Sequence, residues 1–380
     1  MSKIILISEY VKENSNSTGF IWSRIIFRLK KEGFDVKIIS PKIKFKSRFI
    51  NSFILSRVFF KFSNSFLMFL RVLLVINKND IILAGTNPEF LIFFLAIIKY
   101  LKKNHIHLIV HDIFPENLIA AKILSSSSPL FTLLNYFYKL AIKKIDRLYI
   151  IGRDMKPFLL SKGLNPKKIT LMTNWCDTKN ITYKNKSESI ILNKLNWDSY
   201  IVFQFFGNIG RVQGIKNLIA AIKLVNSPRA AFMFVGDGIF FEDVLTASKE
   251  ISNCRIACFP SQPQNLKSKI LRSCDVALIS LSEGMKGLAV PSKAYFSLAA
   301  GKPLLAIMDI NAEVALMIKD EKVGWVVSPN NPIELARAIE HICTLKLEEY
   351  SKRARLLALN KYSEEKVLSK LIYYIKKSFD

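Results

Sequence analysis

A lysine at the start of a short helical stretch is the clearest sign of chemistry in this sequence. Lys293 follows Pro291 and Ser292, and the stretch ends at Gly301, just before a proline that opens an apolar strand. Pro291 suits a first helical turn, Ser292 is expected to satisfy free amide hydrogens, and Gly301 to adopt the left-handed conformation that ends helices. Because a helix start attracts anions, Lys293 is predicted to bind phosphate. The alternative is an ordinary strand-helix-strand unit with a solvated lysine.

Two glycine-rich turns in the same half of the chain indicate similar chemistry. The apolar strand 201–206 runs into a turn containing Gly207, Gly210 and Gly214, and Gly236 and Gly238 follow a second strand. Glycines at a strand-to-helix turn let the backbone approach a ligand, and two nearby cations, Arg211 and Lys216, supply charge for a diphosphate. Neither turn has the GxGxxG spacing, which disfavours a dinucleotide dehydrogenase. Taken alone, each turn favours a structural role, and their position in the same half as Lys293 favours a functional one.

Potential proton-transfer residues occur in the first half. His111, Asp112 and Glu116 come at or just after the predicted strand 107–111, where a base could take a proton from an attacking hydroxyl group. Alternatively, His111 is a core histidine, and the two acids simply favour a helix start. Four residues after the first strand are predicted to line the same edge: Glu9, Ser17, Thr18 and Gly19.

Glu283 lies in a loop shortly before Lys293, with Gly284 and Gly287 on either side of a short charged segment. This composition predicts either a loop that moves over a ligand or a plain surface loop. The sequence contains no clustered metal ligands, no nucleophile elbow and no Walker loop. We therefore expect neither a metal nor a cofactor.

Short apolar strands alternate with amphipathic helical stretches along the whole chain, which predicts an α/β protein with doubly wound parallel sheets. The predicted strands are 3–8, 35–40, 81–84, 107–111, 147–151, 168–172, 201–206, 231–235, 254–259, 276–280, 303–308 and 324–327. A polar run at 178–193 separates two Rossmann-like domains, 1–180 and 190–361, and a C-terminal helix at about 362–380 is expected to pack back on the first. Ligands of such sheets bind beyond the carboxyl ends of the strands, which predicts a site in an inter-domain cleft.

The net charge of +26 is unevenly distributed: residues 1–180 carry 29 Lys and Arg against 11 Asp and Glu. The segment 42–78 mixes basic residues with phenylalanines and contains no acid, a composition that favours an anionic membrane surface over nucleic acid. A buried helix pair with a basic rim is the alternative. No signal peptide or bilayer-spanning segment is apparent, and the five cysteines form no CxxC pair. We expect a cytoplasmic protein, peripheral on the inner face of the plasma membrane, with reduced thiols.

With these motifs in order, the chain resembles glycosyltransferase family 4, whose members have the GT-B architecture of two facing Rossmann-like domains. The motifs that carry the resemblance are Gly19, 112–116, 174–177, 207–214, 236–238, 275–276, 291–293 and 299–303. Within the family, the chain is most similar to WbuB-type O-antigen and capsule enzymes that transfer L-N-acetylfucosamine.

The resemblance implies that the second domain binds a nucleotide-diphosphate sugar, UDP-linked, and that the first binds an undecaprenyl-diphosphate-linked acceptor. The implied donor-binding residues are Gly207, Asn208, Gly210, Arg211, Lys216, Gly236, Gly238, Glu283, Pro291, Ser292 and Lys293. The catalytic residues are expected to be Asp112 and His111, with Ser17, Thr18, Gly19 and Glu116 on the acceptor side. The implied product belongs to O-antigen or capsule polysaccharide.

The chain departs from the family at two places. Asn208 and Gln213 stand where many members have arginine and lysine, and Phe296 stands where a ribose-binding glutamate is usual. Arg211, Lys216 and Lys293 are candidate replacements for the missing cations, and Glu283 for the missing acid. Two other functions remain open from the sequence: a nucleotide-sugar 2-epimerase of the same architecture, and a basic nucleic-acid-binding protein.

Overall fold

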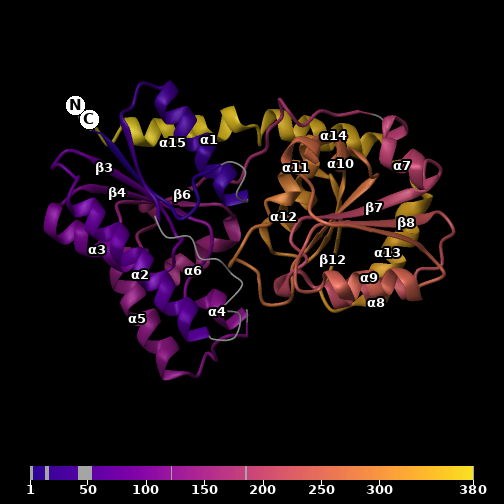
Figure 1. The fold of residues 1–380 in the computed structure, drawn as a ribbon, viewed down its shortest axis with the longest axis horizontal. Helices are drawn as coiled ribbons and strands as arrows, with labels where there is room; N and C mark the ends of the chain where they lie inside the picture. The colour runs from indigo at the N-terminus through magenta and orange to yellow at the C-terminus, as the bar shows by residue number, and fades with distance from the viewer. Residues whose placement is uncertain (1–2, 13–16, 42–53, 121, 185, 380) are drawn as a thin grey trace. The chain divides into compact units, whose positions relative to one another are not determined.

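The structure is a computed structural model that describes residues 3–12, 17–41, 54–120, 122–184 and 186–379. Residues 42–53, the first part of the basic aromatic segment, lie outside the described residues. The chain divides into two compact units (Figure 1). Unit 1 comprises Met1–Thr173 and Leu368–Asp380, and unit 2 comprises Asn174–Val367.

Unit 1 contains a parallel sheet of six strands in the order β2-β1-β3-β4-β5-β6. The strands are β1 (Ile4–Ile7), β2 (Val36–Ile39), β3 (Ile81–Gly85), β4 (His105–Val110), β5 (Arg147–Ile150) and β6 (Ile169–Leu171). In the centre, Ile4 of β1 pairs with Val36 of β2 on one side and Ile81 of β3 on the other. These central strands are apolar and buried, because helices cover both faces of a parallel sheet.

The helices of unit 1 are α1 (Ser17–Lys31), α2 (Ile54–Leu73), α3 (Leu91–Lys102), α4 (Glu116–Ala120), α5 (Pro129–Lys143) and α6 (Lys156–Ser161), with 3-10 turns η1 (Arg153–Met155) and η2 (Pro166–Lys168). α3 packs against both α2 and α5, so these three helices form one layer (Figure 1). No helix in the described part of the chain combines the length and the apolar character needed to cross a bilayer.

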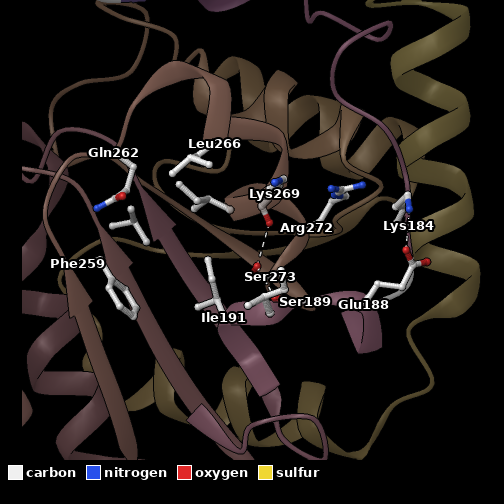
Figure 2. Close-up of a pocket in the computed structure, with 13 residues that line it drawn as sticks. Lys184, Glu188, Ser189, Ile191, Phe259, Gln262, Leu266, Lys269, Arg272 and Ser273 are labelled. Atoms are coloured by element: carbon white, nitrogen blue, oxygen red, sulfur yellow. Dashed lines mark hydrogen bonds and ion pairs between the residues drawn. The ribbon is translucent and has the colours of Figure 1, made fainter. Parts of the chain in front are cut away.

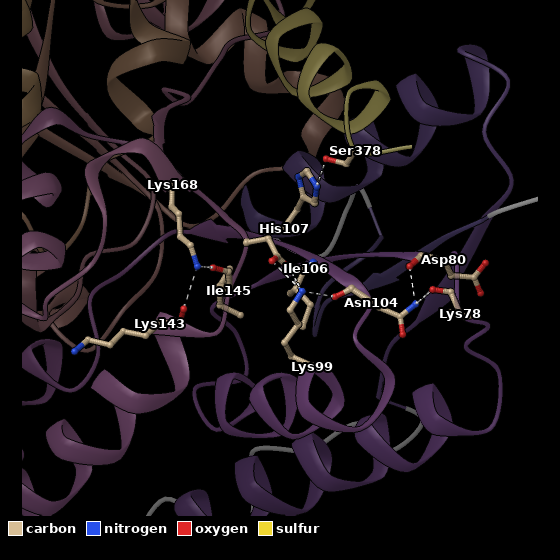
Figure 3. A network of polar contacts seen from close by, with 11 residues as sticks. Lys78, Asp80, Lys99, Asn104, Ile106, His107, Lys143, Ile145, Lys168 and Ser378 are labelled. Atoms are coloured by element: carbon tan, nitrogen blue, oxygen red, sulfur yellow. Dashed lines mark hydrogen bonds and ion pairs between the residues drawn. The ribbon is translucent and has the colours of Figure 1, made fainter. Parts of the chain in front are cut away.

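The C-terminal residues of the chain belong to unit 1, and polar contacts hold them there. The ring nitrogens of buried His107 contact the hydroxyl groups of Tyr149 and Ser378, at 2.8 and 3.0 Å (Figure 3). Burial lowers the pKa of His107 to about 3, so the ring is neutral at physiological pH. At the start of the same strand, the side chain of Asn104 donates to the carbonyl oxygen of Asp80 at 2.8 Å. These polar groups at β4 therefore have structural partners.

Unit 2 contains a second parallel sheet of six strands, in the order β12-β11-β10-β7-β8-β9. Its strands are β7 (Ile201–Phe206), β8 (Ala230–Val235), β9 (Arg255–Phe259), β10 (Val276–Ser280), β11 (Leu304–Ile307) and β12 (Gly324–Val327). Its helices are α7 (Ile190–Leu195), α8 (Ile215–Leu224), α9 (Phe241–Glu250), α10 (Lys267–Arg272), α11 (Lys293–Ala299), α12 (Glu313–Glu321), α13 (Pro332–Thr344) and α14 (Glu348–Asn360), with η3 (Lys186–Glu188), η4 (Arg211–Gln213) and η5 (Gln264–Leu266); α15 (Glu364–Lys376) begins in unit 2 and ends in unit 1.

Alternate residues of the unit 2 strands supply two hydrophobic cores. Phe203 and Phe205 of β7 point to the face covered by α8 and α13, where they stack on aromatic side chains of β8. Val202 of β7 and Met233 of β8 point to the opposite face, which α7 and α10 cover. This alternation is the period of two that a β-strand imposes.

All twelve strands predicted from the sequence are present, with ends that differ by no more than two residues. The largest shift is in β4, which begins at His105 and ends at Val110, so that His111 lies just beyond the strand. The reason is that the polar residue before the strand, Asn104, is bonded to the neighbouring loop and fixes the start earlier than the apolar run suggests.

Candidate active site

Lys293 is the first residue of α11, and its side chain reaches the turn that follows β7. Its Nζ lies 3.1 Å from Oε1 of Gln213 and 3.8 Å from the centre of the Phe205 ring. The face of an aromatic ring attracts a cation, and the amide oxygen accepts one of its hydrogens. Burial lowers the pKa of Lys293 to about 7, so the charge of this group depends on its surroundings. A bound anion would favour the charged form.

The ammonium group of Lys293 lies next to Gln213, which is one of the positions where the chain departs from the family. Gln213 stands where many members have a lysine, and the side chain of Lys293 brings a positive charge to the same turn. Helix α11 therefore places a buried ammonium group beside Gln213.

The two glycine-rich turns of unit 2 pack on each other through their backbones. The amide of Gly207 donates to Val235 at 2.8 Å, and the amide of Ile209 donates to Asp237 at 2.9 Å. A Cβ atom at Gly236 would overlap the carbonyl oxygen of Gly207, and one at Gly238 would overlap the carbonyl of Ile209. Close packing of the two turns thus explains why glycine is required at positions 236 and 238. Their predicted contact with a donor stays a prediction.

Gly207 differs from these two glycines. Its φ is +109°, which favours glycine, yet a Cβ atom there would meet nothing within 4 Å among the described residues. The loop is held from the other side by Ser282, whose hydroxyl accepts from the amide of Gly214 at 3.2 Å and whose amide donates to Val212 at 2.9 Å. The backbone of Gly207 is therefore fixed and has open space beside it, as close approach by a ligand requires.

The other cations of the turn are less confined than Lys293. Arg211 and Lys216 are both exposed, and the Nζ of Lys216 lies 5.7 Å from the centre of the Phe240 ring. Asn208 is exposed as well. Asn208 and Arg211 lie in the turn and Lys216 in the first turn of α8, so all three are exposed near the end of β7.

Glu283 is exposed and accepts a hydrogen bond from Asn330 at 2.8 Å. Its carboxylate therefore already has a partner in the loop after β12. Its predicted role as a substitute for the family's ribose-binding glutamate stays a prediction.

Phe296 is buried, and the Nζ of Lys267 lies 3.1 Å from the centre of its ring. Burial lowers the pKa of Lys267 to about 8, while the carboxylate of Asp177 opposes this change. An aromatic ring thus lies against an ammonium group at the position where the family has an acid.

The sequence prediction for Ser292 as a helix cap is wrong. Ser292 has helical dihedral angles and makes no capping hydrogen bond with its side chain. The amide of Ala294 donates to Pro291 at 3.2 Å, so the chain already turns helically before α11 begins, and the serine lies within that turn. The prediction for Gly301 is confirmed, because its φ is +70° and its amide donates to Leu298.

In unit 1, Asp112 lies just beyond β4 and is held by Thr86 at the end of β3. The Thr86 hydroxyl donates to Oδ1 of Asp112 at 2.6 Å, and the Asn117 amide lies 3.5 Å from Oδ2. Burial raises the pKa of Asp112 to about 6, with a smaller contribution in the same direction from Glu89. A carboxylate with a pKa near neutrality suits a general base.

The ring of His111 lies edge-on to the ring of Trp22, with a centroid distance of 6.3 Å. Burial lowers the pKa of His111 to about 4, so the imidazole is neutral. Its Nε2 is buried and has no hydrogen-bond partner among the described residues. His111 therefore lacks the hydrogen-bond partner that a purely structural core histidine would have at Nε2 among the described residues. Because its ring is neutral, it does not act as a cation.

Glu116 begins α4 and forms an ion pair with Lys162 at 2.5 Å. The Lys162 side chain is only 1% exposed and also donates to Asn135 of α5 at 2.9 Å. Because this lysine is buried, Glu116 has a structural task as its counter-charge. The predicted acceptor-side residues Ser17, Thr18 and Gly19 form the first turn of α1.

Of a group of charges close to Asp112, Glu9 was predicted from the sequence at this edge, but Lys61 and Glu89 were missed as its neighbours. Lys61 of α2 forms an ion pair with Glu89, and both act electrostatically on Glu9, whose pKa is raised by burial. One Glu89 oxygen is buried without a hydrogen-bond partner in the described part of the chain. The only sequence signal for this group was the presence of an acid soon after β1 and another soon after β3. Because the carboxyl ends of parallel strands lie at one edge of a sheet, these two acids come close together. Among the described residues, no cluster of three His, Cys, Asp or Glu side chains could hold a metal ion.

Unit 2 also contains a cavity of about 440 Å³ beside α7 and α10 (Figure 2). The Ser189 and Ser273 hydroxyl groups meet at 2.6 Å at one side of it. None of the residues predicted from the sequence to act in a site lines this cavity, whose lining residues are Lys184, Glu188, Ser189, Ile190, Ile191, Val235, Phe259, Gln262, Leu266, Lys269, Ile270, Arg272 and Ser273.

Comparisons with known proteins add to this geometry. Residues 201–344 match the family described as glycosyl transferases group 1. The chain is 37% identical over 380 residues to the probable glycosyltransferase WbjE of Pseudomonas aeruginosa, covering 96% of this chain and 95% of that protein. It is 22% identical over 239 residues to the putative colanic acid biosynthesis glycosyl transferase WcaI of Escherichia coli K12, covering 62% and 58%.

Two solved structures share the fold over almost the full length. HepE from Anabaena, in complex with UDP, has a TM-score of 0.73 at 12% identity, covering 99% of this chain and 100% of HepE. The lipopolysaccharide outer core galactosyltransferase WaaB has a TM-score of 0.66 at 13% identity, covering 99% of each chain. Together with the two parallel sheets, these likenesses confirm the predicted GT-B fold.

Proposed function

This chain belongs to the glycosyl transferases of group 1, and we propose that it moves a sugar from a UDP-linked donor to a saccharide carried on a lipid diphosphate. UDP as the carrier is supported by the structures of HepE with UDP and with UDP-glucose. Polysaccharide biosynthesis as the purpose is supported by the names of WcaI and WaaB, which refer to colanic acid and lipopolysaccharide.

The observation that carries the donor proposal is the position of Lys293 at the turn after β7. A departing nucleoside diphosphate gains negative charge in the transition state, and a cation held in place by the protein stabilises that charge. Lys293 is held by Gln213 and Phe205, and the open backbone of Gly207 lies on the same turn. Arg211 and Lys216 add exposed positive charge there. With this charge supplied by the chain, we propose that transfer needs no metal ion.

For the acceptor side, we propose Asp112 as the base that takes the proton of the attacking hydroxyl group. The supporting observations are its place at the end of a central strand, its bond from Thr86 and its pKa of about 6. The neutral imidazole of His111, whose Nε2 has no partner in the described residues, is proposed to contact the acceptor sugar.

The finer identity of the substrates follows from the motif resemblance. The proposed donor sugar is an N-acetylated deoxy-aminosugar such as L-N-acetylfucosamine, and the acceptor is a saccharide on undecaprenyl diphosphate, destined for O-antigen or capsule. The acceptor would be met at an anionic membrane surface, with residues 42–78 in contact with it.

The test is a screen of purified protein with UDP-sugars and polyprenyl-diphosphate-linked acceptors, read by mass spectrometry of the lipid product. We expect addition of one N-acetylated deoxy-aminosugar residue. Asp112→Asn should lower kcat by about 100-fold or more, since general base catalysis contributes that much. Lys319→Ala, at an exposed lysine of α12, serves as the control and should retain full activity.

Two results would count against the proposal. Turnover of other nucleotide sugars but of no UDP-sugar would exclude the donor assignment. Full kcat in Asp112→Asn would remove this carboxylate from the mechanism, while leaving the family membership in place.

A further inference from the structure

Unit 1 exposes many apolar side chains on α2, α3 and α5. These three helices form one layer (Figure 1). More than half of the large hydrophobic side chains that are exposed in the described residues lie between residues 58 and 140. Phe59 of α2 is 72% exposed, and Tyr100 at the end of α3 is 79% exposed. Apolar surface on this scale on a single layer usually marks a place of contact.

Helix α5 contributes a complete apolar face that the sequence motifs did not predict. Its exposed side chains recur at helical spacing and are each about half exposed, and they are Leu130, Leu133, Tyr136, Phe137 and Leu140. The opposite face of the helix is buried in unit 1 through Tyr138, Ala141 and Ile142. The helix is therefore apolar on the side that packs and apolar again on the side that does not. A helix at a protein surface that faces water carries polar residues on its exposed side.

The charges around this surface are of one sign. Between residues 36 and 145 the chain has sixteen Lys and Arg against four Asp and Glu. Each of the four acids is already engaged within the fold. Asp80 accepts from two backbone amides, Asp112 accepts from Thr86, and Glu89 and Glu116 pair with lysines. Of the lysines at the ends of α3 and α5, Lys99 pairs with Asp146 at 2.7 Å, whereas Lys102, Lys103, Lys143 and Lys144 are exposed.

From this combination we propose that α5, together with the neighbouring exposed side chains of α2 and α3, lies on an anionic lipid bilayer. Apolar and aromatic side chains enter the headgroup region, and the lysines flanking α5, Lys122, Lys143 and Lys144, meet the lipid phosphates. The inference deepens the membrane part of the proposed function and extends it from segment 42–78 to α5.

Charge complementarity favours a bilayer over a second copy of the chain. In a symmetric dimer the same patch meets itself, so the basic residues around one patch would face those of the other. An anionic bilayer offers an apolar interior and negative charge together, which matches both features of the surface.

The test is co-sedimentation of the full chain with vesicles of phosphatidylcholine, with and without phosphatidylglycerol. We expect binding to the anionic vesicles, weakened by salt, and little binding to the neutral ones. Leu133→Glu removes one half-exposed apolar side chain from the surface and adds a negative charge, and should weaken binding by roughly tenfold. The matched control is Leu356→Glu on α14 of unit 2, because Leu356 is 55% exposed and Leu133 53%. This control should bind as the unchanged protein does.

Phe59→Glu on α2 separates this inference from the broader proposal. Loss of vesicle binding in Phe59→Glu with unchanged binding in Leu133→Glu would overturn the role of α5 and leave membrane contact through α2 in place. Failure of the unchanged protein to bind anionic vesicles at low salt, or a dimer in sedimentation velocity that Leu133→Glu dissociates, would overturn the bilayer as the partner. Transfer activity with a short soluble acceptor, measured in parallel, shows whether the reaction proposed above stands independently.

Discussion

The ammonium group of Lys293 lies 3.1 Å from the side-chain oxygen of Gln213, although 80 residues separate the two in sequence. The pair joins the start of α11 to the turn after β7. The glutamine of the turn accepts a hydrogen of the helix lysine, so a positive charge lies beside the turn.

The first prediction concerns this lysine. Lys293→Ala should lower kcat/KM for the donor by about 100-fold, because one preorganised charge on the leaving diphosphate would be lost. The measurement is steady-state kinetics with varied donor and saturating acceptor. Lys319→Ala is the control, since Lys319 is an exposed lysine of α12 outside the proposed site. A similar loss in both variants would refute a specific role of Lys293.

The pH dependence should show two separate ionisations. Asp112 must be unprotonated to act as a base, so kcat/KM for the acceptor should rise as pH increases through about 6. Lys293 must be protonated to bind the diphosphate, so kcat/KM for the donor should fall as pH increases through about 7. Asp112→Asn should abolish the rise, and Lys293→Ala should abolish the fall. A profile that keeps both limbs in both variants would assign them to other groups.

The contact between the two glycine turns predicts a stability effect. Gly236→Ala should lower the free energy of unfolding by about 3 kcal/mol, because the added Cβ overlaps the carbonyl oxygen of Gly207 and the backbones must separate. Gly284→Ala is the comparison: its φ is +80° but no atom of the described residues lies within 4 Å of the added Cβ. It should cost about 1 kcal/mol through backbone strain alone. Urea unfolding of both variants measures the difference.

Lys162 provides a test of the structural role of Glu116. Lys162→Ala should lower the free energy of unfolding by about 3 kcal/mol, since it leaves the Glu116 carboxylate without its partner in a largely buried place. Lys184→Ala breaks the exposed pair with Glu188 and should cost less than about 0.5 kcal/mol. Equal stability of the two variants, measured by urea unfolding, would mean that the buried pair contributes no more than an exposed one.

The proposed independence from metal can be examined directly. Addition of EDTA, followed by gel filtration into metal-free buffer, should leave the transfer rate unchanged, because Lys293 and the neighbouring cations supply the charge for the diphosphate. Restoration of a lost rate by Mg²⁺ or Mn²⁺ would contradict this expectation.

Much of the fold could be predicted from local sequence. Parallel strands covered on both faces are short apolar runs, and runs such as 4–7 and 201–206 are recognisable without knowledge of their neighbours. The prediction for Gly301 succeeded for a similar reason, because a helix end is a local event. Ser292 failed because a cap depends on the backbone dihedral angles of one residue, which its type does not determine.

The site was only partly predictable for a physical reason. The sequence named Lys293, Gln213, Asp112 and Glu116 as separate features. Which groups meet depends on the order of the strands and the packing of helices on them, and this order is not written in the spacing along the chain. Sheet order places Thr86 beside Asp112, and helix packing places Lys162 beside Glu116.

The sequence by itself therefore determined the twelve strands, the two-sheet architecture, the family motifs and the basic character of the first half, because these follow from local apolar periodicity and residue type. Tertiary structure alone decided that Lys293 reaches Gln213, that Glu116 neutralises a buried lysine, and that α5 is apolar on both sides. Each of these depends on which surfaces become buried when the chain folds, and burial is a property of the assembled unit.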